Sequence, residues 1–120
     1  MSDADRDPSA DLAVLAARVA SDRKATDIVV LDVGDLLSIA GYFVVASASN
    51  ARQVRSVAEE IELRAKEELA RSPVRTEGMR EQQWVLLDYG DVDVHVFLES
   101  VREFYEIERL YMDAPRVACE

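Results

Sequence analysis

Cysteine is nearly missing from this chain: Cys119 is the only one among 120 residues, and it stands next to last. An intramolecular disulfide and a cysteine cluster that binds a metal are therefore excluded, and a reducing compartment is expected. Long apolar runs are missing too, since none approaches the roughly 18 to 20 residues that span a bilayer. The first residues, Met1 to Asp7, are acidic, which is unlike a signal or transit peptide. We expect a cytoplasmic protein that makes no contact with a membrane.

Basic residues are in short supply: 14 lysines and arginines stand against 24 acids, which gives a net charge of −10. A protein that clamps a nucleic-acid backbone generally needs a basic patch, so direct nucleic-acid binding is disfavoured and a basic protein is the expected partner. The excess is uneven, because residues 88–109 hold seven acids and two bases. Half of the net charge thus falls in less than a fifth of the chain.

Residue types that support catalysis and metal binding are also scarce. None of the four glycines opens a phosphate-binding loop, and His95 is the only histidine, so nucleotide and zinc sites lack their usual ligands. One alternative stays open: a strand would separate Asp91 and Asp93 by about 7 Å. Some nucleotide-transferring enzymes hold a divalent metal with such a pair. Apart from this alternative, we expect no catalysis, no metal and no cofactor.

The remaining pattern predicts one domain, residues 9–114, between a disordered lead, residues 1–8, and a tail, residues 115–120. Proline after Asp7 is typical of a helix start, and Ser100 with Glu103 forms a capping box for a last helix. A looser capping box joins Asn50 to Gln53. Apolar β-branched runs predict two central strands. The predicted helices are Pro8 to about Arg23, Ser49 to about Arg71 and Ser100 to about Tyr111, and the predicted strands are Asp27–Asp32, Tyr42–Ser47, an edge strand at 74–77 and a hairpin at 84–97.

This order, α-β-β-α-β-β-β-α, predicts an α/β (α+β) fold in which helices pack on a mixed β-sheet. The hairpin is its most informative part. A two-residue turn at Tyr89-Gly90 would place Asp88 opposite Asp91, Leu86 opposite Asp93 and Trp84 opposite His95, with all six side chains on one face. Because opposed like charges destabilise a sheet, a fold that tolerates them is expected to use them for a cationic partner.

We therefore predict a partner-binding face rather than a catalytic site. Structural alternatives remain for two members, since His95 fits a hydrogen-bonded strand histidine and Trp84 fits the core as well as an exposed anchor. Aromatic side chains among charges are typical of binding hot spots. The candidate residues are Trp84, Asp88, Tyr89, Asp91, His95 and Phe97 on the hairpin, with Tyr105 and Glu108 on the last helix.

Five blocks in order resemble the ribosomal silencing factors of the RsfS/Iojap family. They are Asp27–Val33, Ser38–Val45, Ser49–Arg55, Glu77-Gly78 with Trp84–Phe97, and Arg102–Leu110 followed by Asp113-Ala114. The resemblance implies a degenerate nucleotidyltransferase fold without catalysis. It also implies binding to the large ribosomal subunit through its protein number fourteen, which blocks joining of the small subunit and represses translation under nutrient limitation, in stationary phase for example. Similar proteins form homodimers when free. Asp93 stands where the family usually has an apolar residue, which weakens the metal alternative.

Overall fold

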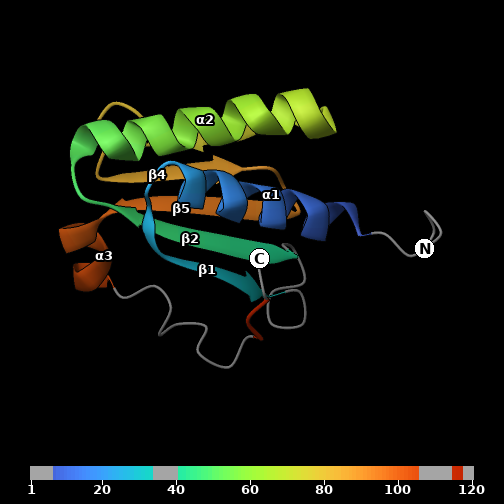
Figure 1. Cartoon of the computed structure of the whole chain (residues 1–120), viewed down its shortest axis with the longest axis horizontal. Coiled ribbons are helices and arrows are strands. Elements are labelled where there is room, and N and C mark those ends of the chain that lie inside the picture. Colours follow the sequence, from blue (N-terminus) through green and yellow to red (C-terminus); the bar gives the residue numbers. More distant parts are fainter. Residues whose placement is uncertain (1–6, 34–40, 106–114, 118–120) are drawn as a thin grey trace.

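The computed structural model describes residues 7–33, 41–105 and 115–117. Their elements follow the predicted order, as Figure 1 shows. Among these residues, no helix combines the length and the apolar character needed to cross a bilayer. The elements are α1 (Pro8–Asp22), β1 (Thr26–Asp32), β2 (Tyr42–Ala48), α2 (Ala51–Leu69), β3 (Arg75–Glu77), β4 (Trp84–Asp88), β5 (Val92–Leu98) and α3 (Glu99–Tyr105).

The five strands form one mixed sheet in the order β1-β2-β5-β4-β3. β5 pairs with β2 in parallel, while the other three pairings are antiparallel. The mixed sheet and its helices confirm the predicted fold class. The last strand in sequence is therefore the central strand in space.

β1 is an edge strand, so its prediction as a central strand is wrong. Its apolar run is buried on both faces all the same, because Val30 joins the core under the helices and Leu31 packs with Phe43 on the other face. Its outer edge pairs with residues 115–117. The Asp32 N–H donates to the carbonyl of Pro115 at 2.8 Å, and the Val117 N–H donates to the carbonyl of Val30 at 2.9 Å.

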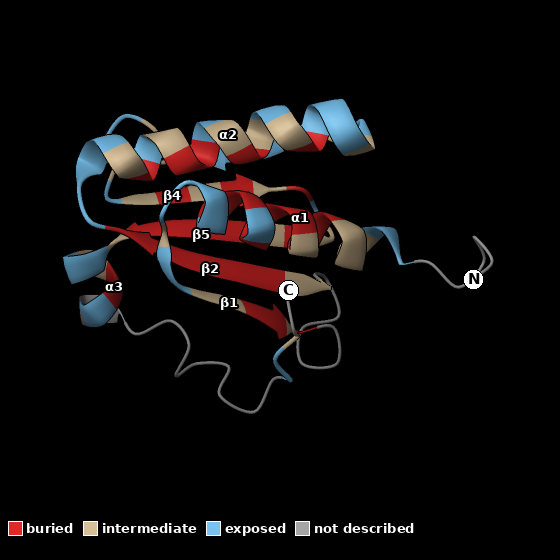
Figure 2. Ribbon diagram, viewed as in Figure 1, coloured by how far each residue is buried: buried red, intermediate tan, exposed pale blue. Residues whose placement is uncertain are grey.

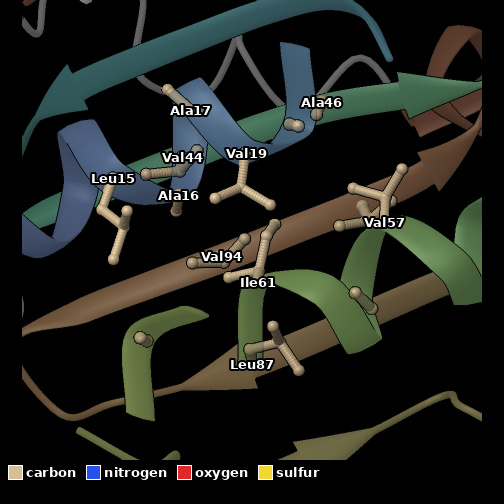
Figure 3. Close-up of a cluster of buried hydrophobic side chains, with 14 of the residues drawn as sticks. Leu15, Ala16, Ala17, Val19, Val44, Ala46, Val57, Ile61, Leu87 and Val94 are labelled. Atoms are coloured by element: carbon tan, nitrogen blue, oxygen red, sulfur yellow. The ribbon is translucent and has the colours of Figure 1, made fainter. Parts of the chain in front are cut away.

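α1 and α2 cover the same side of the sheet, and Figure 2 shows the buried residues between these layers. Apolar residues at helical spacing make this core: Leu15 and Val19 of α1 and Val57 and Ile61 of α2 meet alternate strand residues such as Val94 (Figure 3). Burial of these side chains removes apolar surface from water, which is the dominant stabilising contribution to such a layer. The sheet face turned away from α1 and α2 carries the other alternate residues of each strand, and we call it the second face.

Helix starts follow the sequence signals at α1 and α2. The Asp7 carboxylate accepts from the Ser9 N–H at 3.0 Å, and the Asn50 side chain accepts from the Gln53 N–H at 2.9 Å. The Gln53 amide also accepts from the Ser49 N–H and donates to the carbonyls of Arg23 and Lys24, so it ties the start of α2 to the end of α1.

The predicted capping box of the last helix is wrong. α3 begins at Glu99, directly after β5, so Ser100 lies inside the helix rather than at its cap. What fixes α3 is a tertiary contact that the local sequence does not show. The buried Arg102 guanidinium donates to the Asp27 carbonyl and, at 2.8 Å, to Ser47 Oγ. The predicted end of this helix near Tyr111 lies outside the described residues, as does the side chain of Tyr105.

Candidate functional site

The β4–β5 hairpin turns at Gly90-Asp91, one residue later than predicted. The Tyr89 N–H donates to the Val92 carbonyl at 2.9 Å, and Asp88 Oδ1 accepts from the Gly90 N–H at 2.8 Å. Gly90 has a φ of +91°, which suits glycine. The register therefore pairs Trp84 with Phe97, Leu86 with His95 and Asp88 with Asp93. Since this register differs from the predicted one by two residues, the side chains of the paired strands keep their predicted face.

Asp91 is the exception, and its assignment to the shared face is wrong. Because it belongs to the turn, its carboxylate reaches the helix layer, where it accepts from Ser9 Oγ of α1 and pairs with Arg71 just after α2 at 2.6 Å. Burial raises the pKa of Asp91, but the hydrogen bonds from Arg71 and Ser9 outweigh it and hold the pKa below its usual value. We call Ser9, Arg71 and Asp91 the polar clip.

The polar clip also removes the geometric basis of the two-carboxylate alternative. Asp91 is engaged by Arg71 and Ser9, whereas the Asp93 carboxyl is hydrogen-bonded to Asp88 on the second face. In the part of the chain that the structure describes, no three potential metal ligands gather in one place. The predicted pair therefore does not converge on a common ion.

Four rings lie together on the second face. Trp84 stacks on Phe97 with centroids 4.8 Å apart, and His95 packs against Phe43 at 5.2 Å. Phe97 is completely buried, so its prediction as a surface contact is wrong: α3 covers it, with Val101 packed against the same cluster. Trp84 is only partly buried. It is the ring in this group that a partner can reach while its other side stays anchored.

His95 is 6% exposed and accepts a hydrogen bond at Nδ1 from Trp84 Nε1 at 3.0 Å. Burial lowers its pKa to about 4, so the ring is neutral near pH 7. The alternative of a structural, hydrogen-bonded histidine thus describes His95 better than a direct contact with a partner. Its role on the second face is to hold the Trp84 indole in place.

Tyr89 is also not a surface anchor. It is 4% exposed and joins the core under the helices. Successive side chains of a strand point to opposite faces, so Tyr89, which follows Asp88, points away from the second face. The Arg71 guanidinium lies 5.9 Å from its ring centre. Burial raises the pKa of its hydroxyl to about 12. Glu108, the last of the predicted residues, lies outside the described part of the chain.

The predicted opposition of Asp88 to Asp91 is wrong, and the two acids that face each other across the strands are Asp88 and Asp93. Burial, together with the hydrogen bond and charge of Asp88, raises the pKa of Asp93 to about 6. Arg75 of β3 compensates in part through its ion pair with Asp88 at 3.3 Å. Asp93 Oδ1 is buried and has no hydrogen-bond partner within the described structure. The two carboxylates therefore repel each other, and this repulsion lowers the stability of the fold near neutral pH.

A hollow of about 260 Å³ lies where β3 meets β4, lined by Glu77, Gly78, Trp84 and Leu86. Gly78 has a φ of +87°, and a Cβ on it would lie 2.0 Å from the Trp84 carbonyl oxygen. The chain can approach β4 this closely only with glycine at that position. We call Glu77, Trp84, Leu86 and Asp88 the docking patch, since they combine partly exposed apolar groups with carboxylates at the β3–β4 end of the second face.

Comparison with known proteins places this geometry in a family. Residues 6–120 match the family model described as "Ribosomal silencing factor during starvation". The chain is 39% identical over 101 residues to the ribosomal silencing factor RsfS of Bacillus subtilis, which covers 84% of this chain and 85% of that one. It is 35% identical over 105 residues to the chloroplastic protein Iojap of Arabidopsis thaliana, covering 88% of this chain and 43% of that protein.

The fold agrees with a solved structure as well. A crystal structure of a Chromobacterium violaceum protein superposes with a TM-score of 0.80 at 38% identity, covering 84% of this chain and 83% of that one.

Proposed function

The chain belongs to the ribosomal silencing factor family, and from this premise we propose that it binds the large ribosomal subunit through ribosomal protein number fourteen and blocks joining of the small subunit. The mechanism is steric, because a bound domain occupies the space that the small subunit needs. Translation then falls when nutrients are limiting. This activity requires binding and release but no reaction, and it takes place in the cytoplasm.

The observation that carries the proposal is the docking patch. Trp84 offers an aromatic side chain that is held by His95 and Phe97 yet partly open to solvent. Beside it, Glu77 and Asp88 supply two carboxylates that share a single cation, Arg75, which leaves the patch with an excess of negative charge, and the whole chain has a net charge of −10. Ribosomal proteins are generally basic, so charge attraction would speed the encounter and the indole contact would slow release. We also propose that the free protein is a homodimer, as similar proteins are.

The test is co-sedimentation with isolated large subunits at increasing salt, with a pull-down of purified ribosomal protein number fourteen as the second assay. We expect binding to weaken as salt rises. Trp84→Ala is expected to weaken it roughly 30-fold, as loss of a hot-spot ring does, and Glu77→Gln with Asp88→Asn about tenfold. In a joining assay, the protein should lower the fraction of joined ribosomes in proportion to binding.

The matched control is Glu67→Gln, which removes one carboxylate from the exposed side of α2, in the layer away from the docking patch. It should bind like the unchanged chain. Asp91 is left out of the docking-patch variants, because its carboxylate belongs to the polar clip and not to the second face. Equal co-sedimentation of the docking-patch variants and the control would reject the assigned surface, and no co-sedimentation of the unchanged chain would reject the function.

A further inference from the structure

The outer edge of β1 is closed by the far end of the chain. Residues 115–117 run antiparallel beside β1, with Arg116 opposite Leu31, and Figure 1 shows them next to the end of that strand. Two backbone hydrogen bonds, from Asp32 to Pro115 and from Val117 to Val30, close this half of the edge. The Val117 side chain packs against the core, while Pro115 and Arg116 are exposed.

The other half of the edge is closed differently. Between Thr26 and Val29 the pairing of β1 with β2 is interrupted, and Asp27 has a φ of +49°. The Asp27 carbonyl accepts from the Arg102 guanidinium. A bulge and a side-chain donor thus prevent regular pairing along the first residues of β1. Only Val30 to Asp32 have a regular outer edge, and it is there that residues 115–117 bind.

The sequence of β1 explains why such an edge needs cover. Ile28, Val29, Val30 and Leu31 form an uninterrupted apolar run rich in β-branched residues and free of proline. An open edge strand of this composition is a template for pairing with another chain. Two identical strands can pair antiparallel about a two-fold axis, so a second copy of the same chain is the partner that fits.

We propose that residues 115–117 are an intramolecular guard strand, and that their release turns the outer edge of β1 into a contact between two copies of this chain. The guard strand is short, so it competes with a partner strand through only two backbone hydrogen bonds and one apolar side chain. This contact is separate from the docking patch, which lies at the opposite edge of the sheet. It is also additional to the contact of the proposed homodimer, so the mass of the unchanged chain, whatever its oligomeric state, is the reference for the test.

The experiment compares four proteins: the unchanged chain, a chain ending at Ala114, Val117→Pro and Val117→Ala. Proline removes the N–H that donates to Val30, whereas alanine removes most of the side chain and keeps the donor. The average mass is measured by sedimentation equilibrium over a range of concentrations. We expect the shortened chain and Val117→Pro to gain mass with concentration relative to the unchanged chain, and Val117→Ala, which keeps both hydrogen bonds, to gain less than Val117→Pro. Circular dichroism confirms that each is folded.

Hydrogen exchange at the Asp32 amide identifies the edge. In the shortened chain this amide should exchange at least tenfold faster when dilute and become protected again when concentrated. A peptide of residues 115–120 with Cys119→Ser should restore both protection and the lower mass. Salt should strengthen the association, because Asp27 and Asp32 flank the apolar run and bring like charges together in the pair. Ribosome binding has the opposite salt dependence.

Equal mass for all four proteins would overturn the guard strand, as would association that leaves the Asp32 amide unprotected. Either result leaves the proposed ribosome binding untouched, since that is measured with the docking-patch variants. If the shortened chain does not fold, the comparison of Val117→Pro with Val117→Ala decides the question by the same measurements.

Discussion

At the scale of single residues, the hydrogen bond between Trp84 and His95 shows how one neutral ring supports another. The His95 Nδ1 atom accepts only while it carries no proton, and burial keeps its pKa near 4. The unfolded chain takes up that proton near pH 6.5. The contribution of His95 to the free energy of unfolding is therefore fully present above about pH 6.5. About 3 kcal/mol of it is lost as the pH falls from 6.5 toward 4.

Emission from Trp84, the only tryptophan, can report this protonation directly. We expect its fluorescence to change with a midpoint near pH 4, because a protonated His95 cannot accept from the indole N–H. The measurement is a fluorescence titration of the folded protein. His95→Gln, which keeps an acceptor and does not titrate, should flatten the curve. A midpoint near 6.5 would show that His95 is open to water.

Asp93 has the opposite dependence on pH. The pKa of Asp93 in the fold is about 6, above its usual value, so the carboxyl loses its proton at a lower pH in the unfolded chain than in the folded one. The free energy of unfolding therefore falls as the pH rises from about 4 to 6. We predict that Asp93→Asn raises the free energy of unfolding by about 1 kcal/mol at pH 7, a value reduced because the side chain is partly exposed. Urea unfolding at pH 4 and pH 7 tests this, and an equal gain at both would contradict it.

Gly78 and Gly90 form a matched pair for a backbone prediction. Both have a positive φ, but a Cβ at Gly78 would collide with the Trp84 carbonyl, whereas nothing lies within 4 Å of one at Gly90. Gly90→Ala should cost about 1 kcal/mol of stability from strain alone. Gly78→Ala should cost about 3 kcal/mol because the chain must also move. Denaturant unfolding of both variants gives the difference, and equal losses would count against the close approach.

At the scale of elements, the polar clip joins three pieces that are distant in sequence: the start of α1, the residues after α2 and the β4–β5 turn. A double-mutant cycle with Asp91→Asn and Arg71→Gln should give a coupling of about 1 kcal/mol at pH 7. Because the pKa of Asp91 is lowered in the fold, the coupling is present above its usual pKa and disappears as the pH falls below it. A coupling that persists in strong acid would contradict an ionic contact.

The elements themselves could be predicted because their signals are local. Asp7 before Pro8 and Asn50 before Gln53 mark helix starts through neighbouring residues, and the alternation in Val92 to Val96 marks a strand. Position in the sheet is not local. β1 has the composition of a central strand, but its outer edge pairs with residues 115–117 and not with another strand of the sheet. No pattern within β1 predicts this pairing.

The candidate site could be predicted only in part for the same reason. Alternation placed Trp84, Asp88 and Asp93 on one face correctly. It could not show that α3 buries Phe97, or that a turn shifted by one residue sends Asp91 to the helix layer. Ser9, Arg71 and Arg102 were missed because their partners lie 82, 20 and 55 positions away along the chain.

At the scale of the whole molecule, the sheet separates two kinds of polar group. The polar clip lies with α1 and α2, whereas the docking patch lies on the second face. We predict that Asp91→Asn lowers the melting temperature while binding to large subunits, measured well below that temperature, stays unchanged. Asp88→Asn should do the reverse, weakening binding with no loss of stability. Equal effects of both variants on both measurements would show that the two groups are not independent.

The sheet order has a consequence for synthesis. β5 stands between β2 and β4, yet it is the last of the five strands to leave the translating ribosome. Until Val92 to Leu98 are available, the sheet lacks the strand that joins the β1–β2 pair to the β4–β3 pair, and the packing of α1 and α2 is what connects the two pairs. Completion of the sheet is thereby deferred until β5 has been made, and a released chain that ends at Asp91 should be cut by a protease much faster than the unchanged chain.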